Sequence, residues 1–221
     1  MIAPQPAGMD MNALMGRIRR LVQMDTTVFE EVRTDREATV PALVVAAAST
    51  LLAGFGGWLW WTVTDLPESG DRFIQSFIIG SILSMIVWAL WLGITYVMLT
   101  QVFRARADMG ELIRVMGFAA VPLALSALIF VPVLDFAVGL ISIALLFGLN
   151  VIAVQTTTDA PAGRVLVAVG AGFAVWAIIL TFLVGDDNTL APGFFLFDTG
   201  KEILKDIGEI YSGFDVNIPS E

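Results

Sequence analysis

Arginines that lie outside the long apolar stretches are the side chains best suited to binding chemistry in this chain. Guanidinium groups donate paired hydrogen bonds to phosphates and carboxylates, which anionic lipids and acidic protein segments display. The candidate contacts for a lipid or a protein partner are Arg17, Arg19, Arg20, Arg104, Arg106, Glu111 and Arg114. The alternative interpretation is that these arginines only fix the orientation of the chain in a membrane.

Asn150 is the deepest polar side chain within the apolar stretches, and it is the candidate intramembrane polar site. One interpretation is that it lines a path for a solute or an ion. The other is that it forms a hydrogen bond between two helices, worth about 0.6 kcal/mol on average. The second interpretation is favoured, because such bonds are common between membrane helices.

Residue types exclude most catalytic chemistry. The chain has no Cys and no His, which rules out thiol catalysis and the usual zinc sites. An intramembrane serine protease needs a Ser paired with His or Lys at depth. An aspartyl protease needs two membrane Asp residues, and here Asp135 lies at a turn. We therefore expect a protein that is not an enzyme, with no metal site, no cofactor and no nucleic-acid partner, and an uncharacterised membrane enzyme is the alternative.

Five long stretches free of charged residues dominate the rest of the sequence. Hydrophobic residues make up 57% of the chain and charged residues 15%, against roughly 45–50% and 25% in soluble domains. A spanning helix needs about 20 mainly apolar residues. The expected spans are residues 41–63, 78–100, 115–132, 136–157 and 165–184. The predicted fold is an all-α integral membrane bundle of five transmembrane helices, within residues 38–185.

Amphipathic segments are expected on both sides of this bundle. In residues 1–37, apolar side chains recur at helical spacing at Leu14, Ile18, Leu21 and Val22. This helix is expected either to lie on the inner leaflet or to pack on the bundle. Residues 186–221 form an acidic tail, in which an apolar stripe from Ile203 to Tyr211 predicts a short helix.

The basic residues predict the orientation. Nine of the 12 Lys and Arg residues lie before the first span or in the second–third and fourth–fifth loops. The positive-inside rule then places the N-terminus in the cytoplasm and the acidic tail outside the cell. A prokaryotic plasma membrane is the expected location.

Several local sequences, in this order along the chain, resemble the Yip family of five-span membrane proteins. The matching segments are VFEEVRTDREAT at Val28–Thr39, RADMGELIRVMGFAAVP at Arg106–Pro122 and NVIAVQTTTDAPAGRVLVAV at Asn150–Val169. The second segment contains Gly110, Glu111, Arg114, Gly117, Phe118 and Pro122 as in prokaryotic members. The third–fourth turn departs from the family's Pro-Gly-rich pattern, and the acidic tail looks like an addition.

The resemblance implies a cytoplasmic N-terminus followed by five clustered transmembrane helices. Eukaryotic members are linked to Rab GTPases, trafficking and organelle shape, but the acidic N-terminal motif associated with that role is not evident here. The expected function is a non-enzymatic membrane organiser or adaptor that binds protein partners or lipids. The alternative is a small permease or transporter subunit, in which Asn150 faces a hydrated cavity at mid-depth.

Small residues recur every four positions in two of the expected spans. The stripes are Ala42, Ala46, Thr50 and Gly54 in the first span, and Ala168 and Gly172 in the fifth. Such stripes let helix backbones approach closely in lipid. We expect them to pack within the bundle, and a homo-oligomer face is the alternative.

Overall fold

The computed structural model describes residues 10–63, 73–131, 134–185 and 188–189. The expected helix of the acidic tail lies outside the described residues, as do Arg72 and the two residues at 132–133 of the third–fourth turn.

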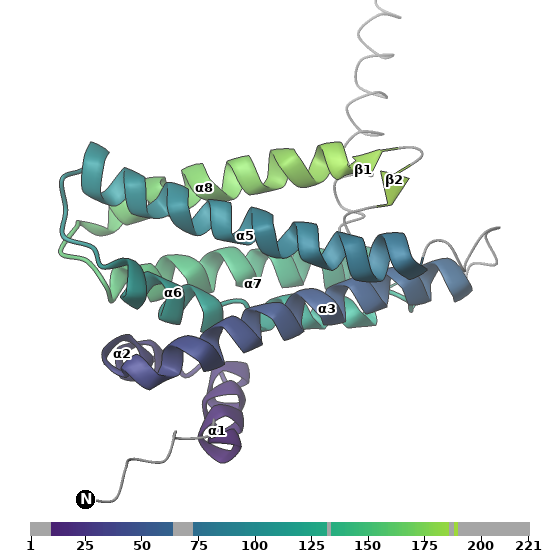
Figure 1. The fold of residues 1–221 in the computed structure, drawn as a ribbon, viewed down its shortest axis with the longest axis horizontal. Coiled ribbons are helices and arrows are strands. Elements are labelled where there is room, and N and C mark those ends of the chain that lie inside the picture. The colour runs from purple at the N-terminus through teal and green to yellow at the C-terminus, as the bar shows by residue number, and fades with distance from the viewer. Residues whose placement is uncertain (1–9, 64–72, 132–133, 186–187, 190–221) are drawn as a thin grey trace, which may run out of the picture.

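Long apolar helices run side by side along one axis and form the body of the molecule (Figure 1). In the described residues, five segments are long and apolar enough to cross a membrane. They are α3 (Thr39–Val63), α5 (Gly80–Val97) with π-helical ends η2 (Phe73–Ile79) and η3 (Met98–Val102), α6 (Met109–Phe118) with η4 (Val121–Leu128), α7 (Asp135–Gln155) and α8 (Ala162–Leu183). The prediction of an all-α membrane bundle is confirmed.

The third span is broken rather than continuous. The α-helix α6 ends at Phe118, and the 3₁₀ segment η4 begins at Val121. Pro122 explains the break, because proline lacks an N–H and its ring clashes with the carbonyl four residues earlier. Irregular backbone is tolerated at membrane depth only where protein covers it. Accordingly, this span is the most buried of the five, with 61% of its apolar window inside the bundle.

Glycines allow the closest helix contacts. A Cβ on Gly117 would lie 2.7 Å from the carbonyl oxygen of Ala42, where α6 crosses α3. A Cβ on Gly56 of α3 would overlap the backbone of η4 at Ser126 and Ala127. The small residues of α3 are therefore used inside the bundle, as expected from their spacing.

The pair α5–α8 is joined around Trp91. Its indole Nε1 donates a hydrogen bond of 3.0 Å to the carbonyl oxygen of Val169. Its ring lies 5.4 Å from the ring of Phe173 and 5.8 Å from that of Trp176. A Cβ on Gly172 would lie 2.8 Å from the Trp91 carbonyl oxygen, so only glycine fits there without a shift.

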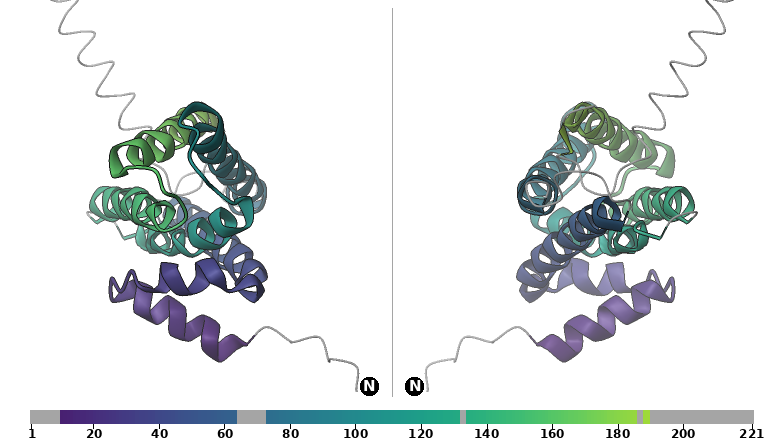
Figure 2. Two further views of the ribbon diagram at one scale, coloured as in Figure 1. Left: turned by 90° about the vertical axis from the view of Figure 1, so that its left-hand side faces the viewer. Right: turned by 90° about the vertical axis from the view of Figure 1, so that its right-hand side faces the viewer.

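Short helices pack against one side of the bundle near one of its ends, and Figure 2 (left), which looks at the bundle from that end, shows them below the spans. They are α1 (Met11–Val22), α2 (Val28–Thr34) and the 3₁₀ turn η1 (Arg36–Ala38). The α5–α6 and α7–α8 connections lie at the same end (Figure 1). At the other end, the two-residue strands β1 (Val184–Gly185) and β2 (Asn188–Thr189) pair antiparallel.

Candidate functional site

A charged platform lies at the α1–α2 end of the bundle. We define it as α1, α2, the connection 103–108, the first turn of α6 and the connection 156–161 (Figure 2). It contains every arginine that the sequence marked as a candidate contact, apart from Arg114, which lies one turn further along α6. The topology therefore brings together two basic segments that are distant in the sequence.

Arg114 is buried beneath the platform, with 8% of the residue exposed. Its Nη2 donates to the carbonyl oxygen of Arg33 at 2.6 Å, and its Nε donates to that of Val32 at 3.1 Å. These carbonyls belong to the last turn of α2, where no intrahelical donor remains for them and where a cation is favoured. The guanidinium of Arg114 thus caps a helix within the chain, and its role as a contact for a partner or a lipid stays a prediction.

Arg33 continues this chain of contacts toward the fourth span. Its Nη1 donates to the carbonyl oxygen of Thr156 at 2.7 Å, immediately after α7. Its Nη2 lies 3.1 Å from Glu30 Oε2. Two arginines therefore fasten α2 to α6 on one side and to the end of α7 on the other.

Ion pairs fasten α1 to α2. Arg17 pairs with Glu31 at 2.8 Å and with Asp35 at 2.7 Å. Arg20 pairs with Asp25 at 2.8 Å and with Glu31 at 2.7 Å. Arg17 and Arg20 are thus engaged within the chain, whereas Arg19 is exposed and has no ion pair in the part of the chain that the structure describes.

These contacts keep the three carboxylates charged. The hydroxyl of Thr27 and the guanidinium of Arg20 lower the pKa of Asp25 to about 2. The Arg17 guanidinium holds the pKa of Glu31 and that of Asp35 below their usual values. The network is therefore fully ionised at neutral pH.

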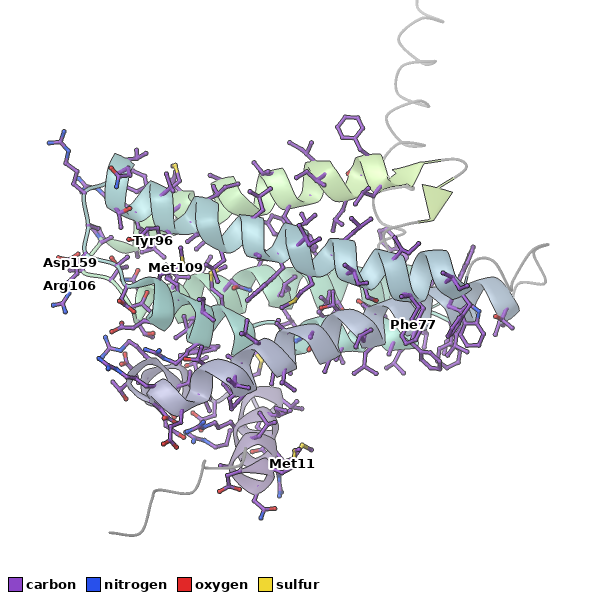
Figure 3. All side chains as sticks on the ribbon, viewed as in Figure 1. Met11, Phe77, Tyr96, Arg106, Met109 and Asp159 are labelled. Carbon is purple, nitrogen blue, oxygen red and sulfur yellow. The ribbon has the colours of Figure 1, made fainter. Side chains whose placement is uncertain are left out.

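A polar hollow of about 300 Å³ opens beside this network. It is lined by Arg33, Arg106, Asp108, Glu111, Thr157, Thr158 and Asp159. The backbone N–H of Arg106 donates to Asp159 Oδ1 at 2.9 Å, and the two residues lie together at this end of the molecule (Figure 3). Asp108 Oδ1 accepts from the backbone N–H of Glu111 at 2.9 Å, which begins α6.

The hollow carries charges of both signs. The side chains of Arg104 and Arg106 are exposed and form no ion pair among the residues described. The carboxylates of the hollow do not combine with other described residues into a group of three that could hold a metal ion. The arrangement suits polar and charged groups of a ligand rather than a cation site.

Sequence reasoning identified Arg106 and Glu111 but missed the opposite wall of the hollow, Thr157–Asp159. The available signal was topological, because the second–third and fourth–fifth connections must lie on the same side of a five-span protein. Pairing these two connections would have placed Asp159 opposite Arg106.

The interior at mid-depth is closely packed. A cavity of about 10 Å³, which includes Ser84 and Trp88 in its lining, has room for about one water molecule. Asn150 is fully buried, and its Nδ2 donates to the carbonyl oxygen of Leu146 in the same helix at 2.8 Å. Its Oδ1 has no partner among the described residues. Within the described part of the chain, Asn150 therefore makes no interhelical hydrogen bond, and it is not among the residues that line the cavity beside Ser84 and Trp88.

The family model of the Yip1 domain matches residues 24–185. The chain belongs to the Yip1 domain family. No curated protein and no solved structure matches the chain. The Yip1 domain includes α2, the five spans and the polar hollow, and the expected family resemblance is confirmed. The matched region begins after α1, so this helix precedes the Yip1 domain.

Proposed function

We propose that this Yip1 domain protein is a non-enzymatic membrane organiser or adaptor, whose platform binds a protein partner in the cytoplasm. The observation that carries the proposal is the polar hollow, which is open and bordered by charged groups such as the Arg106 guanidinium, which forms no ion pair with any residue that the structure describes. It is also built on fixed supports, because Arg114 and Arg33 fasten α2 beneath it. Prepositioned charges favour specific recognition of a partner with complementary charges.

In this proposal, the exposed arginines determine which end of the bundle faces the cytoplasm. Those at the platform end include Arg19, Arg36, Arg104, Arg106 and Arg164. The positive-inside rule favours a cytoplasmic platform and an acidic tail on the outside. The resemblance of Arg106–Pro122 to prokaryotic members supports a prokaryotic plasma membrane.

The packing of the bundle supports an adaptor over a permease. A transported solute needs a polar path at membrane depth, and ionisable groups usually mark such a path. The cavity lined by Ser84 and Trp88 has room for about one water molecule, and the Oδ1 of Asn150 is buried without a hydrogen-bond partner among the described residues. The platform, by contrast, offers a hollow large enough for several side chains of a partner.

Photo-crosslinking in intact cells tests the proposal. A benzophenone amino acid replaces Arg104, at the exposed rim of the platform, or Ile82, an exposed apolar residue of α5, as the matched control. We expect a defined protein adduct from position 104 and none of the same mass from position 82. The double change Glu111→Gln and Asp159→Asn keeps the shapes of both side chains but removes two charges, and it should abolish the adduct.

An adduct that persists in the double variant would show that the hollow is not the contact. Equal adducts from positions 104 and 82 would indicate neighbours met at random in the membrane. Either result would contradict the proposed binding surface, provided that the variants reach the membrane in equal amounts.

A further inference from the structure

The helix α1 has more apolar surface than the bundle covers. Leu14 and Leu21 face the bundle and are 5% and 2% exposed. On the neighbouring side of the helix, Met11, Met15 and Val22 are 58%, 57% and 68% exposed. We call these three residues the outer edge. The sequence grouped Val22 with Leu14 and Leu21 on one stripe, whereas the structure separates an inner side from an outer edge.

The position of α1 places this edge beside a candidate membrane span. The helix runs across the direction of the spans rather than along it (Figures 1 and 2). It contacts η4, which is part of the third span, so α1 lies beside the bundle and not beyond its end. Figure 3 shows Met11 directed from α1 toward the end of the bundle where Phe77 lies and away from the end where Arg106 and Asp159 lie.

The surface beside α1 is already one that lipid must cover. In the first turns of α3, Val40, Leu43 and Val44 are exposed although they belong to a membrane span. The outer edge of α1 adds to this apolar surface at the same end of the bundle. Exposed apolar side chains in water would be unfavourable by about 25 cal/mol per Å², whereas acyl chains accommodate them.

Two of the three arginines of α1 are directed away from the outer edge. Arg17 and Arg20 are held by Glu31, Asp35 and Asp25 of the α2 region and are not available to lipid phosphates. Arg19 is the one arginine of α1 that is exposed and without an ion pair among the described residues. Contact with the membrane should therefore depend mainly on the apolar side chains, with at most one charged contact from α1 to an anionic headgroup.

We infer that α1 is an interfacial helix whose outer edge, Met11, Met15 and Val22, inserts among the acyl chains of the leaflet at the platform end. An amphipathic helix that lies in the plane of the membrane buries its apolar side at the boundary between headgroups and acyl chains. The inference concerns a lipid surface and does not depend on the protein partner proposed above. It assigns a role to a helix that precedes the Yip1 domain.

Single-cysteine labelling tests the inference directly, because the natural chain contains no cysteine. The reporter is Met15→Cys on the outer edge, and the matched control is Gly16→Cys, the next residue, where an added Cβ meets nothing within 4 Å. Each variant carries an NBD fluorophore in nanodiscs of phosphatidylcholine with some phosphatidylglycerol. We expect doxyl groups on the acyl chains to quench position 15 at least about twofold more than position 16, and aqueous iodide to show the reverse order.

Equal access of iodide to positions 15 and 16 would overturn the inference. Protection of position 15 from both iodide and doxyl lipid would also overturn it, since protein rather than lipid would then cover the edge. Val22→Cys compared with Gln23→Cys provides a second, independent pair of reporters on the same helix. Nanodiscs without phosphatidylglycerol should give nearly the same doxyl quenching at position 15, because two of the three arginines of α1 are paired within the chain and Arg19 alone is exposed.

Discussion

Arg114 donates a 2.6 Å hydrogen bond to the carbonyl oxygen of Arg33, while the guanidinium of Arg33 donates to the carbonyl oxygen of Thr156 at 2.7 Å. One arginine thus caps the helix that carries the next arginine, and the second arginine bonds the chain at the end of α7. Both arginines donate to main-chain carbonyl oxygens. Substitution of the residues that carry these carbonyls leaves the acceptors in place.

Replacing Arg114 with Gln should loosen the platform. The change removes a buried cation from the end of α2 and leaves the carbonyl oxygens of Val32 and Arg33 without their charged donor. We expect a loss of about 2–3 kcal/mol in the free energy of unfolding, measured by reversible denaturation in mixed detergent micelles. Hydrogen exchange should show the increase in opening at α2 rather than in α5 and α8.

Arg104→Gln is the matched control for this change. Arg104 is exposed and forms no ion pair within the described ranges. The free energy of unfolding of the Arg104→Gln variant should therefore stay within about 0.5 kcal/mol of that of the natural protein. Equal losses from both substitutions would show that net charge, and not the cap on α2, is responsible.

Gly172→Ala should weaken the α5–α8 pair. The new Cβ would lie 2.8 Å from the carbonyl oxygen of Trp91 and would also overlap its indole ring. Overpacking of this kind costs about 1–3 kcal/mol, which thermal unfolding in detergent would detect. Gly170→Ala, two residues away, meets nothing within 4 Å and should leave stability unchanged or slightly higher. A loss at position 170 equal to that at 172 would contradict the assigned contact.

Acid should release α1 from α2 before the spans separate. Because contacts in the folded protein lower the pKa of Asp25, Glu31 and Asp35, the ion pairs contribute fully above about pH 4.5. Their contribution is lost as the pH falls toward about 2, the pKa of Asp25. Hydrogen exchange of residues 11–22, referenced to α8 at each pH, should rise over this range.

Glu31→Gln should increase the same exchange already at neutral pH, since Glu31 accepts from both Arg17 and Arg20. Glu37→Gln changes an exposed carboxylate that forms no ion pair in the described chain, and it should have no such effect. If the two variants behave alike, the ion pairs do not hold α1.

Asn150→Leu should leave stability unchanged or raise it by about 1 kcal/mol. The substitution removes a buried Oδ1 that has no partner among the described residues, and it sacrifices only a bond to Leu146 in the same helix. Asn150→Asp places a carboxyl group at the same depth and should cost about 3 kcal/mol. A marked loss of stability in Asn150→Leu, measured in mixed micelles, would show that the amide has a partner and a role that the packing does not reveal.

Length and composition were sufficient to predict the membrane bundle, because few alternatives can bury apolar stretches as long as Ala38–Thr64 or Val165–Gly185. The break after Phe118 was less predictable. Pro122 indicates a kink, but whether a helix bends or changes to 3₁₀ depends on the neighbour that covers the exposed carbonyls. Here that neighbour is α3, which is distant in the sequence.

The platform was predicted only in outline. Charge patterns identified the arginines, but a cap such as that of Arg114 on α2 joins residues about 80 positions apart, and its acceptors are main-chain atoms. Every residue offers such acceptors, so residue types do not reveal the pairing. The same limit applies to α1, whose outer edge is recognisable only after Leu14 and Leu21 have been placed against the bundle.

The broken third span has a consequence for how the protein is made. Segment η4 contacts α3 through Gly56, and its carbonyls would be poorly satisfied if it faced lipid by itself. We therefore expect it to enter the bilayer already paired with the first helix, rather than as an independent unit. If α3 is absent or misplaced, we expect η4 to insert poorly into the bilayer. In this sense the first span assists the insertion of the third.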